Sequence, residues 1–112
     1  MTNNIEVTLD KNAVLLKINK MQGKTTKIIA NELLKDSNYY AREDTGELIR
    51  SSIRASKLEE GELVWDTPYA KMMYYVGSPS KDTNPNASLL WAQKAADENK
   101  EKYQRMIDKL MG

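Results

Sequence analysis

The stretch from Asp44 to Gly77 reads DTGELIRSSIRASKLEEGELVWDTPYAKMMYYVG, and its pattern decides the fold that the sequence predicts. It opens with the tripeptide Asp44-Thr45-Gly46, which suits a turn because glycine adopts positive φ without a steric penalty. Residues 47–52 fit either a helical turn or the extended start of a strand. Apolar and polar residues then alternate from Ser52 to Lys57, and a period of two predicts a half-buried strand.

The second half of this stretch predicts a returning strand and a short helix. Glu59-Glu60-Gly61 is suited to a turn, and Leu63-Val64-Trp65 supplies β-prone bulk after it, so residues 53–65 predict a β-hairpin. Asp66 or Thr67 is a suitable N-cap and Pro68 suits the first helical position. We therefore expect a short helix over residues 69–76, with apolar residues on nearly every side.

Towards the N-terminus, residues 5–9 alternate between apolar and polar and predict a strand with one buried face. Residues 13–39 contain no proline, and their apolar residues recur at helical spacing, which predicts one long helix. A lysine stripe recurs on that expected helix, at Lys17, Lys20, Lys24 and Lys27. Such a stripe is either a solvated face or a surface for an acidic partner such as nucleic acid.

Towards the C-terminus, residues 77–86 are rich in Gly, Pro, Ser and Asn and predict a loop. This loop is either a flexible surface connection or a segment that becomes ordered against a neighbouring subunit. Asn84 as N-cap and Pro85 in the first turn predict the start of the last helix. Its apolar seam has heptad spacing and packs either inside the fold or between subunits: Leu89, Ala92, Ala96, Asn99, Tyr103, Met106 and Leu110.

These elements predict a single α+β domain over residues 1–112. We expect a small antiparallel sheet of three or four strands, formed by the N-terminal strand and the β-hairpin. Two long helices would cover one face of this sheet, and the short helix would be the third. Since an isolated hairpin is only marginally stable, the N-terminal strand must pair with it.

The composition argues against most kinds of catalysis. The 112 residues carry 17 basic and 16 acidic side chains, so no global field attracts nucleic acid or membrane. No Cys and no His are present, which removes the commonest metal ligands, the thiolate nucleophile and the commonest general base. The carboxylates of Glu59, Glu60 and Glu62 lie at an expected turn, where solvent keeps them ionised. We expect no enzyme activity, cofactor or metal, and synthesis in a cytoplasm, because no signal-peptide pattern opens the sequence.

Several short motifs follow one another along the chain. They are Asp44-Thr45-Gly46-x-Leu48-x-Arg50-x-Ser52, then Thr67-Pro68-Tyr69-Ala70 with Tyr74-Tyr75, then Asn84-Pro85-x-Ala87 and Trp91. In this order and spacing the chain resembles the small minor capsid, neck or tail-completion proteins of long-tailed bacteriophages and prophages, especially those of Gram-positive hosts. The resemblance covers most of the chain from residue 40 onward.

This resemblance implies a structural virion protein, made in the bacterial cytoplasm, that forms a ring at the head–tail junction. Its partners would be copies of itself, the connector on the portal side and tail proteins. The alternative is a small nucleic-acid-associated regulator that uses the lysine stripe. Tyrosine and methionine are enriched at interfaces, although the tyrosines would equally close the core beside Trp65, and the arginines would equally pair across the hairpin. The candidate interface residues are Arg50, Arg54, Tyr69, Met72, Tyr74, Tyr75, Lys81 and Asn84.

Overall fold

The structure, a computed structural model, describes residues 6–10, 13–42, 46–77 and 84–111. Helices and strands mix along the chain, which confirms the expected α and β class. The strands are β1 (Glu6–Asp10), β2 (Ala13–Lys17) and β3 (Glu62–Trp65), with a short 3-10 turn η1 (Leu58–Glu60) before β3. The helices are α1 (Thr25–Tyr40), α2 (Glu47–Ala55), α3 (Ala70–Tyr75), α4 (Trp91–Glu98) and α5 (Lys100–Met111).

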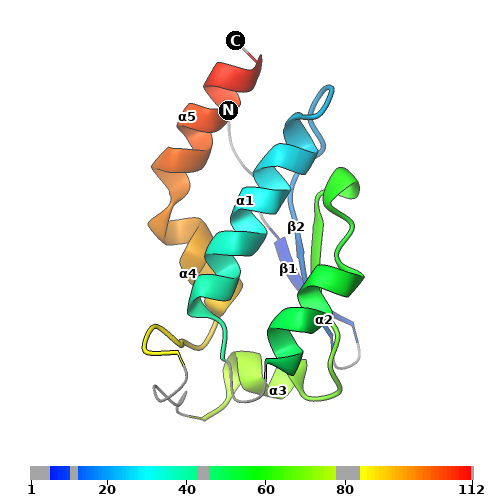
Figure 1. Cartoon of the computed structure of the whole chain (residues 1–112), viewed down its shortest axis with the longest axis vertical. Coiled ribbons are helices and arrows are strands. Elements are labelled where there is room, and N and C mark those ends of the chain that lie inside the picture. The colour runs from blue at the N-terminus through cyan, green and yellow to red at the C-terminus, as the bar shows by residue number, and fades with distance from the viewer. Residues whose placement is uncertain (1–5, 11–12, 43–45, 78–83, 112) are drawn as a thin grey trace.

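The strands form an antiparallel sheet in the order β1-β2-β3. Helix α1 crosses in front of this sheet, α4 and α5 run beside α1, and α2 lies next to β3 (Figure 1). The core lies between the sheet and the helices. Trp65 of β3 meets Trp91 of α4 edge to face at 5.9 Å, and Tyr74 of α3 meets Trp91 at 4.7 Å between ring centroids. All three side chains are buried, so one aromatic cluster joins the sheet to two helices.

The expected helix over residues 13–39 is wrong in its first part, where the chain forms β2. Val14 and Leu16 are buried and alternate with the more accessible Leu15 and Lys17. The backbone of β2 bonds to a strand on each side, with Leu16 opposite Val7 of β1 and opposite Leu63 of β3. The spacing of the apolar residues is compatible with a helix or with a strand. Pairing of β2 with β3, some fifty residues later in the sequence, selects the strand.

The expected strand over residues 53–57 is also wrong, because most of that segment belongs to α2. Leu48, Ser51 and Ser52 form its buried face, while Ile53 is 69% exposed. The hydroxyl of Ser51 donates to the carbonyl of Leu48 at 2.7 Å, and that of Ser52 donates to Ile49 at 2.7 Å. The serines thus satisfy their hydroxyls within the helix. The predicted strand over Leu63-Val64-Trp65 is found as β3, but it pairs with β2.

Two predicted helix starts are wrong. Helix α3 begins at Ala70, with Tyr69 at the N-cap position and no side-chain cap. The carboxylate of Asp66 pairs with Arg54 at 2.6 Å, and the hydroxyl of Thr67 is buried without a hydrogen bond. Helix α4 begins at Trp91, well after Asn84. The amide of Asn84 instead donates to the carbonyls of Tyr39 and Ala41 at 3.0 and 2.9 Å.

The expected last helix is interrupted at Asn99. The amide of Asn99 donates to the carbonyl of Ala95 at 3.0 Å, ending α4 before α5 begins at Lys100. The heptad seam is thereby divided: Ala92, Ala96 and Tyr103 are buried, and Leu110 near the end of α5 is exposed.

Replacing Gly61 by alanine tests how tightly the chain passes between η1 and β3. Gly61 has φ +73°, and a Cβ there would lie 2.8 Å from the carbonyl oxygen of Ile18. Gly23 has φ +60° but nothing within 4 Å of the same position. We expect Gly23→Ala to cost about 1–2 kcal/mol of unfolding free energy through backbone strain, and Gly61→Ala to cost about 1–3 kcal/mol more through overpacking. Urea unfolding of both variants measures this, and equal losses would contradict the close approach.

Candidate interaction surface

One end of the molecule brings together three segments that are distant in sequence. The C-terminal end of α1, helix α3 and the residues before α4 meet there (Figure 1). The Ser88 N–H donates to the Tyr40 carbonyl at 2.9 Å, and the Leu90 N–H donates to the Tyr74 carbonyl at 2.9 Å. With the two bonds of Asn84 to the end of α1, these contacts fix the segments relative to one another.

These same segments carry a group of exposed apolar side chains. Met72 of α3 is 58% exposed and Tyr75 is 45% exposed. We call this group the aromatic end, and it consists of Tyr39, Met72, Tyr75, Val76 and Leu90. A contiguous exposed apolar surface is typical of a contact site, so this end of the fold is the candidate interaction surface.

Arg42 holds the aromatic end together from inside. Its Nη1 donates to the carbonyls of Met73 at 3.1 Å and Val76 at 2.7 Å, at the C-terminal end of α3. A guanidinium at a helix C-terminus is electrostatically favourable. Its Nε is buried without a hydrogen-bond partner, and no acidic side chain of the described residues pairs with it. The aromatic end therefore contains a cation whose charge no carboxylate of the described chain balances.

The structure divides the candidate interface residues into three groups. Met72 and Tyr75 lie at the aromatic end. Tyr74 is buried in the core, and Tyr69 is half-buried against it. The others lie elsewhere or make internal contacts: Arg50 bonds to Glu47 at 2.6 Å, Arg54 bonds to Asp66, Asn84 is a buried anchor, and Lys81 lies outside the described residues.

The sequence patterns did not predict that Tyr39, Val76 and Leu90 belong to this surface. A usable signal was present at the two Tyr-Tyr pairs, because neighbouring positions of a helix point about 100° apart and do not face the same core. Burial of Tyr74 therefore turns Tyr75 outward. The other pair behaves alike: Tyr39 is exposed, and Tyr40 packs against the core. The centroids of these two rings lie 5.0 Å apart, edge to face.

The lysine stripe does not exist as one helix face. Lys17 ends β2, Lys20 lies in the connection after it, and Lys24 and Lys27 lie at the start of α1. Three of the four lysines pair with glutamates around η1: Lys17 with Glu62 at 3.9 Å, Lys20 with Glu60 at 2.9 Å and Lys27 with Glu59 at 3.6 Å. These pairs neutralise the positive charge on which the nucleic-acid alternative depended.

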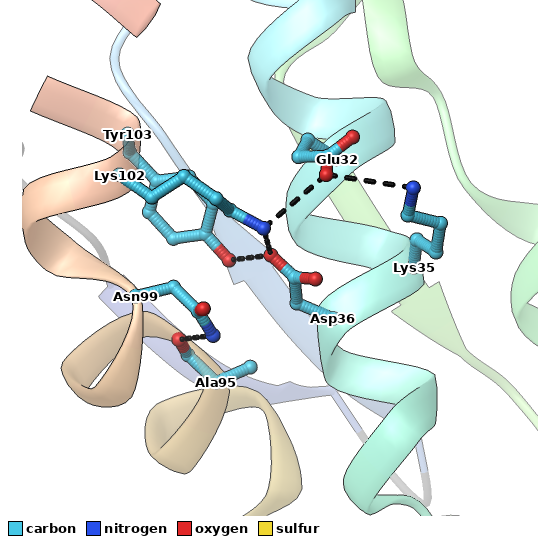
Figure 2. A network of polar contacts seen from close by, with 7 residues as sticks. All are labelled: Glu32, Lys35, Asp36, Ala95, Asn99, Lys102 and Tyr103. Carbon is cyan, nitrogen blue, oxygen red and sulfur yellow. Dashed lines mark hydrogen bonds and ion pairs between the residues drawn. The ribbon is translucent and has the colours of Figure 1, made fainter. Parts of the chain in front are cut away.

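The best-connected polar group joins α5 to α1 (Figure 2). Lys102 Nζ lies 2.5 Å from the Asp36 carboxylate and 3.2 Å from that of Glu32, and the Tyr103 hydroxyl donates to Asp36 at 2.6 Å. Desolvation opposes the charge on Lys102, but its bonds to Asp36 and Glu32 raise its pKa overall. Burial, followed by the contact with Asp36, raises the pKa of Tyr103. Tyr103 thus remains a protonated hydrogen-bond donor, and the group acts as a clamp between two helices.

Across residues 6–10, 13–42, 46–77 and 84–111, no group of three or more acidic side chains converges as a metal site would require. No helix in this part of the chain is long and apolar enough to span a bilayer.

Comparison of the chain with protein-family models, with curated proteins and with solved structures finds no match.

Stability at high pH tests the burial of the two tyrosines. Burial raises the pKa of Tyr74 to about 12 and also raises that of Tyr103. An unfolded tyrosine ionises near pH ~10, so above that pH the unfolded chain binds fewer protons than the folded chain. The contribution of these two tyrosines to the free energy of unfolding should therefore be constant from neutral pH to about pH 10 and then fall by up to ~1.4 kcal/mol per pH unit for each tyrosine. The raised pKa of Lys102 adds a decline of the same sign.

Tyr103→Phe removes one of these two ionisations. Urea unfolding at several pH values should show a shallower decline above pH ~10 for this variant than for the unchanged chain. Identical slopes would show that Tyr103 does not keep its proton in the folded state.

Proposed function

We propose that the chain is a non-enzymatic structural component of a phage virion at the head–tail junction, as a minor capsid, neck or tail-completion protein. It would be made in the host cytoplasm and then incorporated into the particle. The resemblance of its ordered motifs to such proteins suggests the class of function. The aromatic end is the observation that supports it most directly, since it provides a preformed surface for neighbouring subunits.

The composition and rigidity of the aromatic end favour a contact role. Tyr and Met are enriched at the buried centres of interfaces. Backbone bonds between the three segments, together with Arg42 and Asn84, hold the backbone that carries these side chains. A surface that is ordered before contact loses less conformational entropy on binding, so more of the burial energy contributes to affinity.

The proposed mechanism is geometric. The aromatic end of one copy would contact a different surface of the next, and such a heterologous contact closes into a ring when the rotation between copies fits. The portal-side connector and tail proteins would provide the template on which the copies assemble. We expect the free chain to be monomeric. Lys81, which lies outside the described residues, remains a proposed contact.

The nucleic-acid alternative lacks a supporting observation. The four lysines do not form one face, and three of them are paired with Glu59, Glu60 and Glu62. The charge available for phosphate contacts is correspondingly small. We therefore propose assembly as the function.

Substitution at the aromatic end tests the proposal. Met72→Ser combined with Tyr75→Ser removes two exposed side chains. Because the Tyr75 ring also meets the buried Tyr74 ring edge to face at 5.1 Å, urea unfolding and circular dichroism check that the variant folds. Loss of two central contacts at an interface typically weakens it about tenfold or more. We expect the variant to co-sediment with connector or tail complexes at least about tenfold less than the unchanged chain at equal concentration.

Leu110→Ser is the matched control, because Leu110 is 44% exposed, close to the 45% of Tyr75, and lies at the far end of α5. This control should co-sediment normally. Unchanged co-sedimentation of the aromatic-end variant, or an equal loss in both variants, would count against the proposal. Absence of co-sedimentation for the unchanged chain would also do so.

A further inference from the structure

The chain itself satisfies the carbonyl groups at the C-terminal end of α3. The Met73 and Val76 carbonyls accept bonds from Arg42 at 3.1 and 2.7 Å. The Tyr74 carbonyl accepts one from the Leu90 N–H at 2.9 Å. The last carbonyls of a helix have no partner within the helix and otherwise bind water or a ligand. A partner that docks at the aromatic end therefore finds these three acceptors already occupied.

Two cations remain available at the same end. Arg42 uses Nη1 for its two carbonyls, and its Nε is buried. Its Nη2 makes no hydrogen bond to the described residues and is not one of their buried unpaired atoms, so it reaches solvent. Lys71 is exposed and lies four residues before the exposed Tyr75, on the same face of α3. A partner that covers Tyr75 and Val76 therefore meets both cations.

No carboxylate of the described residues balances these two charges. Residues 38–42 and 67–77 contain both cations but no Asp or Glu. The acids that flank these stretches are engaged elsewhere, Asp36 in the clamp to α5 and Asp66 by Arg54. Burial of a cation is costly unless an opposite charge pairs with it. A partner that covers this surface gains most when it supplies carboxylates.

We propose that the aromatic end binds an acidic segment of the connector or tail protein, in which apolar side chains lie between Asp or Glu residues. The apolar side chains of the segment pack on Met72, Tyr75 and Val76, and its carboxylates pair with Arg42 and Lys71. This inference rests on the proposed function and specifies the chemistry of the partner at the same surface.

Nucleic acid also supplies negative charge, but the surface suits a protein segment better. Two cations contact too few phosphates for binding that persists at moderate salt. Met72, Val76 and Leu90 are aliphatic and exposed, and they provide no aromatic face on which a base could stack. They match the apolar side chains of a protein segment instead.

A second copy of the chain offers less complementary charge. Among the described residues, the exposed large apolar side chains outside the aromatic end are Ile28, Ile53, Leu110 and Met111. Each of these three sites has a basic residue next to it in the sequence: Lys27, Arg54 and Lys109. Docking of any of them on the aromatic end brings like charges together. A different protein therefore fits better as the partner.

Carbodiimide cross-linking of the full chain bound to connector or tail complexes tests the proposal. The reagent joins a lysine amine to a carboxylate that touches it, with loss of water, and mass spectrometry identifies the joined residues. We expect Lys71 to be linked to an Asp or Glu of the connector or tail protein. Lys100 is the matched control, because it is also exposed and lies in the first turn of a helix, and it should give no such link. Lys71→Arg keeps the charge, so it should bind normally and lose the link.

Charge reversal tests the same contact by affinity. Lys71→Glu should weaken co-sedimentation with these complexes about tenfold or more, because repulsion replaces an ion pair. Lys100→Glu should co-sediment as the unchanged chain does. Raising the salt concentration from about 50 to about 500 mM should weaken binding of the unchanged chain and reduce its difference from Lys71→Glu. Urea unfolding checks that both variants fold.

The inference and the proposed function fail in different ways. If Met72→Ser with Tyr75→Ser weakens binding but Lys71→Glu does not, the acidic segment is refuted and the proposed function stands. If neither substitution weakens binding, or the unchanged chain does not bind, both are refuted.

Other results would overturn the inference alone. Binding without any link from Lys71 is one, and a link from Lys71 to another copy of this chain would assign the surface to that copy. A link from Lys71 to an acid of its own chain in the free protein would show that the charge is already balanced. A thymidine oligonucleotide that binds this end as tightly as the junction proteins do would assign it to nucleic acid.

Discussion

The contact between Trp65, Trp91 and Tyr74 is the interaction on which the rest of the structure depends. It joins β3 to α4 and α3, and the Trp65 Nε1 also donates to the Asn38 amide oxygen of α1 at 2.9 Å. Four elements, α1, β3, α3 and α4, therefore meet at one buried aromatic cluster. Burial of Tyr74 in this cluster has a second effect, because its neighbour Tyr75 must then point outward. The core and the aromatic end are thus two consequences of the same packing.

Sequence patterns predicted the parts of the fold in which local preference and final structure agree. Leu63-Val64-Trp65 is β-prone and forms β3, and the short helix after Pro68 is α3. The failures lie where distant contacts decide. Residues 13–17 have apolar spacing compatible with a helix, but the strands on either side of them select the extended form. Residues 52–57 alternate as a strand would, but burial of Leu48, Ser51 and Ser52 on one face selects a helix through residue 55.

The candidate site was predictable to a similar extent. Met72 and Tyr75 were expected at a contact surface and are exposed at the aromatic end. Arg54 pairs with Asp66 as one of the two interpretations predicted, although from a helix. Tyr39 and Leu90 were missed because their exposure depends on how three segments meet. The lysine stripe was predicted wrongly because residues 13–39 were expected to form one helix. The chain instead turns at Gly23, and three of the four lysines lie beside the glutamates around η1.

The central claim is that the aromatic end contacts other subunits in an assembled particle. A photo-crosslinking amino acid placed at position 75 or at position 110 tests this claim directly, since Tyr75 and Leu110 are similarly exposed at different ends of the molecule. Irradiation of assembled particles, followed by mass spectrometry, identifies what each position touches. We expect adducts from position 75 to another copy or to a junction protein, and few from position 110. Particles without adducts at position 75, or with equal yields from both positions, would contradict it.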